Sequence, residues 1–360
     1  MYSEQDLRDA VAGGAISAEA AEALRAHVAV LRHMPVIDEE NFRLVNSFND
    51  IFVTIGAVIM LVAMGAIGEA LLPSVSGPSP LSAVLVAATA WMLAEVFTRA
   101  RRMALPSIVL LLAFVGGTFA TFLGLSITLV GDDPANSGET LAIVLVAASA
   151  LLTAGAAWLH WRRFMVPITV AAGAAAVAAT VIALIVAAIG PESEALENMI
   201  LPLVFIAGLA VFAFAMRWDT SDRERRTRRS DVAFWLHLLA APMIAHPVFA
   251  LIGVMDNDAI GVGSAVAVLA VYVAFGLIAL AVDRRALLVS ALAYVLVALT
   301  FLFDRFGAVE LTFALTALVI GSALLTLSAF WAPIRARVVE ALPGTVQARV
   351  PAAGPVPLPA

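Results

Sequence analysis

Residues 141–189 read LAIVLVAASALLTAGAAWLHW, then the pair Arg162 and Arg163, then FMVPITVAAGAAAVAATVIALIVAAI. Each apolar run has the length that an α-helix needs to cross the hydrocarbon core of a bilayer, about 20 residues. The two arginines between the runs are too costly to place inside that core. This stretch therefore predicts two membrane-spanning helices joined by a short turn at one membrane surface.

The whole chain has the composition of an integral membrane protein. Its 360 residues are 62% hydrophobic and only 13% charged, and the mean hydropathy is +0.99. A soluble domain is roughly half apolar and a quarter charged, so a water-facing surface cannot be built from this mixture. We expect an all-α polytopic transmembrane helix bundle of about ten spans, over residues 51–72, 81–97, 106–130, 141–161, 164–189, 199–218, 232–255, 260–282, 287–303 and 311–331.

The arginines give an independent check on this count, because cytoplasmic loops are enriched in basic residues. If the N-terminus is cytoplasmic, ten spans place every arginine except Arg305 on the cytoplasmic side. Four of the five loops on the other side carry acidic residues. One span more or fewer would destroy this separation. We therefore expect a bacterial inner-membrane protein with both termini in the cytoplasm.

The two ends of the chain differ from the membrane domain of residues 51–331. In residues 1–50, Ser17 is placed to cap a helix, and Gly13–Gly14 to end the helix before it. These residues predict a small cytosolic helical hairpin that rests on the membrane domain or binds a protein partner. Residues 332–360 begin with an amphipathic turn of Ile334, Val338, Val339 and Leu342, and they end in prolines and alanines without a packing face. We expect this cytosolic tail to be disordered.

The N-terminal segment carries a short motif. Gly14, Ile16, Ser17, Glu19 and Ala21 follow the form G-x-[IL]-S-x-E-x-A, ahead of an array of spans. This arrangement resembles bacterial membrane proteins of the DUF2157 type, over roughly the first tenth of the chain. The resemblance implies a bacterial membrane setting and adds no catalytic or binding residue.

Missing residue types exclude several kinds of chemistry. The chain has no cysteine and no lysine, which excludes disulfides, thiolate metal sites, cysteine nucleophiles and Schiff bases. Phosphate-binding glycine loops and metalloprotease motifs are also absent from the sequence. We expect no cofactor, no metal site and no catalytic residue, and no interaction with nucleic acid.

The candidate site residues lie in the second and seventh spans. Glu95 is an ionisable group inside a span, with Arg99 four residues later as an alternative, structural ion-pair partner. His237, Pro242 and His246 lie in the seventh span, where Pro242 frees a backbone carbonyl. Broken helices with exposed carbonyls form midplane sites in many transporters, whereas other proline kinks serve packing alone. We predict a substrate or ion site at these four residues.

These observations support two hypotheses from different classes. The first is a small-solute or lipid-related permease, whose span count and termini are similar to those of the drug/metabolite transporter superfamily. The second is a non-transporting membrane scaffold or sensor that acts through the N-terminal hairpin. An enzyme acting on lipid is a third, for which no nucleophile–base pair is recognisable. Membrane lipids are the expected partners, and self-association stays open.

Overall fold

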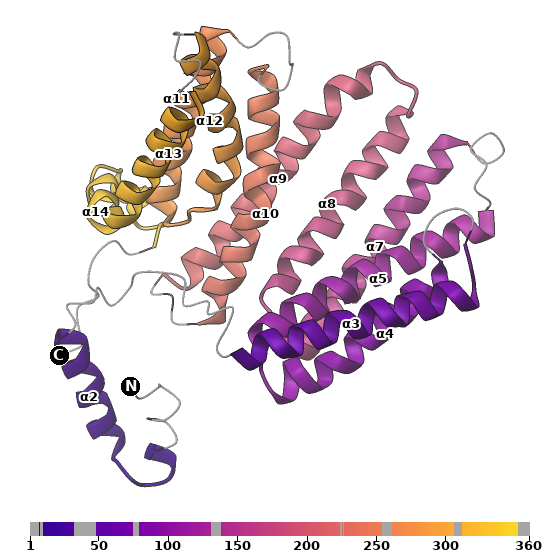
Figure 1. The fold of residues 1–360 in the computed structure, drawn as a ribbon, viewed down its shortest axis with the longest axis horizontal. Coiled ribbons are helices and arrows are strands. Elements are labelled where there is room, and N and C mark those ends of the chain that lie inside the picture. Colours follow the sequence, from indigo (N-terminus) through magenta and orange to yellow (C-terminus); the bar gives the residue numbers. More distant parts are fainter. Residues whose placement is uncertain are drawn as a thin grey trace. The chain divides into compact units, whose positions relative to one another are not determined.

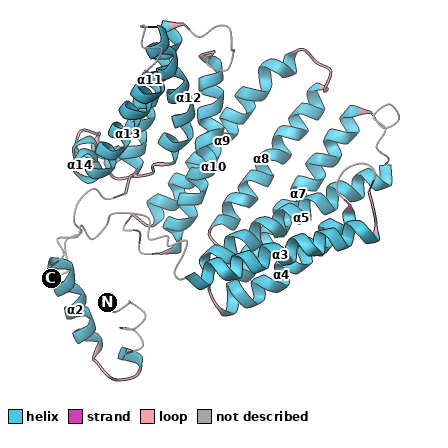
Figure 2. Cartoon of the chain, viewed as in Figure 1, coloured by secondary structure: helices cyan, strands magenta, loops and turns pink. Residues whose placement is uncertain are grey.

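The computed structural model describes residues 7, 10–31, 48–74, 79–130, 138–223, 225, 227–253, 261–305 and 312–351. Over these residues the protein is helical and contains no strand (Figure 2). The predicted all-α polytopic bundle is confirmed. The chain divides into two compact units, residues 1–39 with 352–360 and residues 40–351, each of which is considered by itself.

The first unit contains α2, Ala18–Leu31. The Ser17 hydroxyl accepts a hydrogen bond from the backbone N–H of Ala20 at 3.1 Å, which is the predicted N-terminal cap. Gly14 has a φ of 71° and ends the preceding helical turn, as expected.

The second unit holds helices at the first nine predicted spans, and among the described residues these nine are long and apolar enough to cross a membrane. The helix of the second span continues without interruption into a π-helical turn, η1. In chain order the helices are α3 (Phe48–Leu71), α4 (Pro80–Ala94) with η1 (Glu95–Ala100), α5 (Ala104–Val130), α7 (Glu139–Phe164), α8 (Ile168–Ile189), α9 (Ala195–Ser221), α10 (Arg228–Leu251), α11 (Val262–Val282) and α12 (Ala286–Arg305).

The tenth predicted span has a different form. Helix α13, Thr312–Ala329, lies where the span was expected. It is followed at once by α14, Trp331–Glu340, at an angle of 73°. The two pass the length and hydropathy requirements for a span only as a bent pair, so the described helices provide nine spans or ten.

The C-terminal segment corrects one expectation. Residues 332–351 were expected to be disordered, but they contain the rest of α14 and the short helix α15, Gly344–Gln347. Trp331, Arg335 and Val339 follow one another at four-residue intervals and form a buried face of α14. The expected amphipathic turn included Val339 of this face but not Arg335, because an arginine does not mark a buried position in a sequence. Residues 352–360 lie outside the described part of the chain.

Helix α10 lies at the centre of the packing. It contacts α8, α9 and α12, and Figure 1 shows α9 and α10 between α8 and α12. More than half of its most apolar stretch is buried inside the protein, a larger share than in any other described span. Leu236, Ala240, Ala245 and Phe249 of α10 are fully buried in the larger hydrophobic core. A second core joins α3, α4, α5 and α7.

Candidate functional site

Glu95 is held by two arginines. Its carboxylate accepts hydrogen bonds from Nε and Nη2 of Arg163, at 2.7 and 2.9 Å, and from Nη1 of Arg99 at 3.3 Å. The Arg99 pair is the alternative that the sequence offered, and the Arg163 pair was not foreseen. Because Arg163 ends α7, the bidentate pair ties the ends of the second and fourth spans together.

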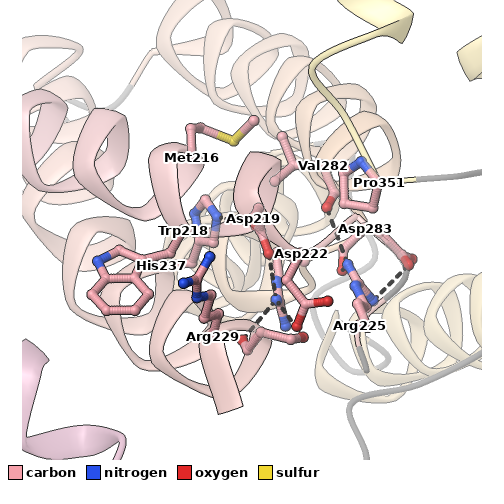
Figure 3. Close-up of polar contacts among 12 residues, drawn as sticks. Met216, Trp218, Asp219, Asp222, Arg225, Arg229, His237, Val282, Asp283 and Pro351 are labelled. Atoms are coloured by element: carbon pink, nitrogen blue, oxygen red, sulfur yellow. Dashed lines mark hydrogen bonds and ion pairs between the residues drawn. The ribbon is translucent and has the colours of Figure 1, made fainter. Parts of the chain in front are cut away.

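His237 belongs to a buried charged cluster. Its Nε2 lies 2.8 Å from Oδ2 of Asp219, and Nη2 of Arg284 donates to Oδ1 of the same carboxylate at 2.7 Å. Arg284 also donates to the carbonyl oxygen of Ser230 at 3.0 Å. The three side chains are 3% exposed or less. We call Asp219, His237 and Arg284 the Asp219 cluster; Figure 3 shows His237 beside Asp219.

Asp283 is the centre of a second cluster next to the first. Its carboxylate is paired with Nη1 of Arg225 at 2.8 Å and with Nε of Arg335 at 3.4 Å. The indole N–H of Trp331 donates to it at 2.7 Å. Burial and the neighbouring Arg284 lower the pKa of Arg225, while Asp283 raises it. Because an arginine stays protonated in proteins, the contact of Arg225 with Asp283 is a buried ion pair.

Arg335 of this second cluster, which we call the Asp283 cluster, and the nearby Arg223 also hold the C-terminal segment. Arg335 donates to the carbonyl oxygen of Pro351 at 2.7 Å, and Arg223 donates to those of Gln347 and Val350, each at 3.1 Å. Pro351 and Val350 are buried. Figure 3 shows Pro351 close to Asp283. The two clusters therefore join α9, α10, the α11–α12 turn and the C-terminal segment.

His246 and Pro242 lie elsewhere on α10, and both are exposed on the protein surface. Nδ1 of His246 lies 2.7 Å from the hydroxyl of Tyr294 on α12. Helix α10 runs from Arg228 to Leu251 through both of its prolines, so the broken helix considered from the sequence does not form. Packing on both sides holds α10 helical even though each proline removes one hydrogen bond.

The structure does not bring the four predicted site residues together. Glu95 contacts Arg163, His237 contacts Asp219, and His246 contacts Tyr294. A single site made from all four side chains is therefore not present in this structure. A binding role for any one of them stays a prediction.

A cavity of about 220 Å³ lies at the arginine-bearing ends of the helices. Three segments wall it: the turn between η1 and α5, the turn between α7 and α8, and the first two turns of α10. The polar residues of its lining are Thr98, Arg102, Ser107, Arg228 and Asp231. We call this space the basic-end cavity. Its residues were not singled out from the sequence, because they lie on three separate turns.

The remaining wall of the basic-end cavity is mostly apolar. It includes Ile108, Phe164, Val166, Ile168 and Trp235. Binding sites for whole drug-sized molecules usually measure about 300–1,000 Å³, so this cavity suits the head of a larger molecule or a small solute. The lining therefore combines charged and apolar residues.

The backbone around the cavity is unusual. Arg102 and Met165, both in its lining, have φ values of 53° and 55°, in the left-handed region that non-glycine residues seldom adopt. Thr98 lies in the π-helical turn η1, and such turns often occur at functional sites. These features place the cavity walls where the chain departs from regular helix.

No group of three or more histidine, aspartate or glutamate side chains in the described part of the chain could hold a metal ion. Comparison with known proteins adds no further assignment: no family model, no curated protein and no solved structure matches the chain. The resemblance of the N-terminal motif to proteins of the DUF2157 type therefore stays a prediction.

Proposed function

We propose that this multi-pass membrane protein binds the acidic group of an amphipathic molecule in the basic-end cavity, as part of a lipid-related permease. The observation that carries the proposal is the pairing of Arg102 and Arg228 with an apolar wall in one cavity. Guanidinium groups bind phosphate and carboxylate groups through two parallel hydrogen bonds. One carboxylate, Asp231, lines the same space, so the two arginines give it a net positive charge.

The position of the cavity supports a ligand that comes from the membrane. We propose that the arginine-bearing helix ends face the cytoplasm of a bacterial inner membrane, as the distribution of basic residues predicts. Anionic lipids of that leaflet attract basic residues by about 1 kcal/mol per charge. An acidic lipid headgroup and a free phosphate share the chemistry that the arginines recognise. Only the lipid also has an apolar portion, its acyl chains.

Transport is the finer part of the proposal. Two features support it: α10 carries two internal prolines, and it takes part in a buried charged cluster through His237. Ionisable groups inside membrane segments often mark pathways for substrates or ions. Passage of the bound molecule along α10 would connect the basic-end cavity with the region of Pro242.

The binding step is tested with the full-length protein in nanodiscs. A spin-labelled phosphatidate serves as the probe, and inorganic phosphate alone serves as the competitor. We expect the double substitution Arg102→Gln and Arg228→Gln to weaken probe binding by about tenfold or more, as the loss of charge-assisted hydrogen bonds implies. Arg349→Gln is the matched control, since Arg349 is an exposed arginine outside the cavity lining.

Two results would contradict the binding proposal: equal affinity in the double variant and the wild type, or full displacement of the probe by inorganic phosphate alone. The transport step is tested separately, by the rate at which proteoliposomes move a fluorescent acidic lipid between leaflets. A rate equal to that of protein-free vesicles would reject the permease while leaving the binding result intact.

A further inference from the structure

His160 lies in an aromatic enclosure within the membrane domain. It is 1% exposed, on the last turns of α7. The rings of Trp91, Phe114 and Phe164 surround its imidazole, with centroids 5.9, 5.4 and 4.5 Å away. A polar ring buried among apolar rings needs hydrogen-bond partners for both of its nitrogens.

One of the two nitrogens has such a partner. Nδ1 lies 3.3 Å from the hydroxyl of Thr169 on α8. Nε2 is buried and has no hydrogen-bond partner among the described residues. When the Thr169 hydroxyl donates to Nδ1, the imidazole proton is on Nε2, which is then a donor that still lacks an acceptor.

The imidazole packs against one residue of the basic-end cavity lining, Phe164. Phe164 lines that cavity and follows His160 by four residues, so the two side chains share one face of α7. His160 is therefore one turn, about 6 Å, further from the end of α7 than Phe164. Thr169 likewise follows the cavity residue Ile168. The cavity residue Phe164 thus contacts the imidazole, with ring centroids 4.5 Å apart.

We propose that His160 is a second ligand contact of the basic-end cavity and that the ligand is an acidic glycerolipid. The acidic group binds Arg102 and Arg228, and rotation of the Phe164 ring lets Nε2–H of His160 donate to an acyl-ester carbonyl one helical turn deeper. This inference rests on the binding function proposed above. It adds the substrate class, because an ester carbonyl below a phosphate is a feature of glycerolipids that simple phosphates lack.

The test compares two probes that differ only in the carbonyl group. One is an acyl lysophosphatidate, and the other is its alkyl-ether counterpart with the same chain length. Binding of each to the full-length protein in detergent micelles is measured by titration calorimetry. We expect the wild type to bind the ester more tightly by about fivefold, the usual effect of one neutral hydrogen bond.

Three variants assign that preference to His160. His160→Leu should bind both probes equally, whereas His160→Gln, which keeps an N–H donor, should restore part of the preference. Trp158→Leu is the matched control, because it removes an exposed ring with an N–H group from the same helix, outside the cavity lining, and it should keep the full preference. The ratio of the two affinities within one variant does not depend on the fraction of protein that is folded.

The outcomes separate this inference from the proposal on which it rests. If the wild type binds neither probe, the binding function fails and the inference fails with it. If the wild type binds both probes equally, or if His160→Leu still prefers the ester, His160 is a packing residue only. The binding function would survive that second result.

Discussion

Arg225 and Asp283 form a buried ion pair of 2.8 Å in which both residues have left-handed backbone conformations, with φ values of 52° and 60°. Asp283 ends α11 in that conformation, and Arg225 lies in the connection between α9 and α10. Two chain turns far apart in the sequence thus meet through one pair of charges. This contact fixes the ends of the helices around α10.

The first prediction concerns the charge of Asp283. Asparagine tolerates the left-handed conformation as aspartate does, so the effect of Asp283→Asn reports the loss of the charge. Removing one partner of a buried ion pair typically costs about 3–5 kcal/mol, because the remaining arginine charges stay buried without compensation. We expect a clearly lower midpoint of thermal unfolding in detergent, together with faster proteolysis of residues 332–351.

Glu340→Gln is the control for this prediction, since Glu340 is an exposed carboxylate on the same C-terminal segment. It should change neither the unfolding midpoint nor the rate of proteolysis. An Asp283→Asn variant with wild-type stability and wild-type proteolysis would show that the cluster does not hold the C-terminal segment.

The second prediction concerns the Asp219 cluster. Asp219→Leu alone leaves the Arg284 guanidinium buried beside an apolar group, and we expect a loss of about 3–5 kcal/mol. The double variant Asp219→Leu and Arg284→Met removes both charges, and we expect it to be more stable than the single variant. Chemical unfolding in mixed micelles measures the difference. The single variant Arg284→Met completes the comparison. If the loss of stability in the double variant equals the sum of the losses in the two single variants, the two residues are not coupled.

The third prediction concerns a close approach of α9 and α10 at Gly208. A Cβ atom at Gly208 would lie 2.9 Å from Cβ of Met243, so any larger residue must move one of the two helices. Gly208→Ala should destabilise the protein by about 1–3 kcal/mol through overpacking. Gly155→Ala is the matched control in α7, where a Cβ atom would meet nothing within 4 Å. That control should be neutral or slightly stabilising, because alanine favours helix.

The fourth prediction uses the absence of cysteine from the sequence. Single cysteines at Glu192, in the turn between α8 and α9, and at Thr345, in α15, are compared by labelling intact cells with an impermeant maleimide. If α13 spans the membrane, five spans separate the two positions and they lie on opposite sides. We expect Glu192→Cys to be labelled from outside and Thr345→Cys only after permeabilisation. Labelling of both from outside would reject the tenth span.

The spans were predictable from the sequence because burial in lipid requires long apolar runs, and such runs are local. The pair of Glu95 and Arg99 was foreseeable for the same reason, since four residues separate them on one helix face. The pair of Glu95 and Arg163 spans 68 residues, and no spacing rule connects two helices that become neighbours only after packing.

The buried clusters were missed for a related reason. Asp219 and Asp283 lie at the ends of spans, where an isolated carboxylate is normally solvated, and only the fold places Arg284 and Arg225 against them. In the C-terminal segment the amphipathic turn that includes Val339 was foreseeable, whereas its packing was not, because Arg335 belongs to the buried face of α14. The basic-end cavity combines residues from three turns, and no single stretch of sequence carries its pattern.

The binding of an acidic amphipathic ligand in the basic-end cavity is tested most directly by photocrosslinking. A phosphatidate with a photoreactive group beside its phosphate is bound to the full-length protein, and the modified residues are identified by mass spectrometry. We predict crosslinks at cavity residues such as Met103, Met165 and Trp235, and their loss in the Arg102→Gln, Arg228→Gln double variant. Crosslinks found only on helix faces outside this cavity, unchanged in the double variant, would contradict the account.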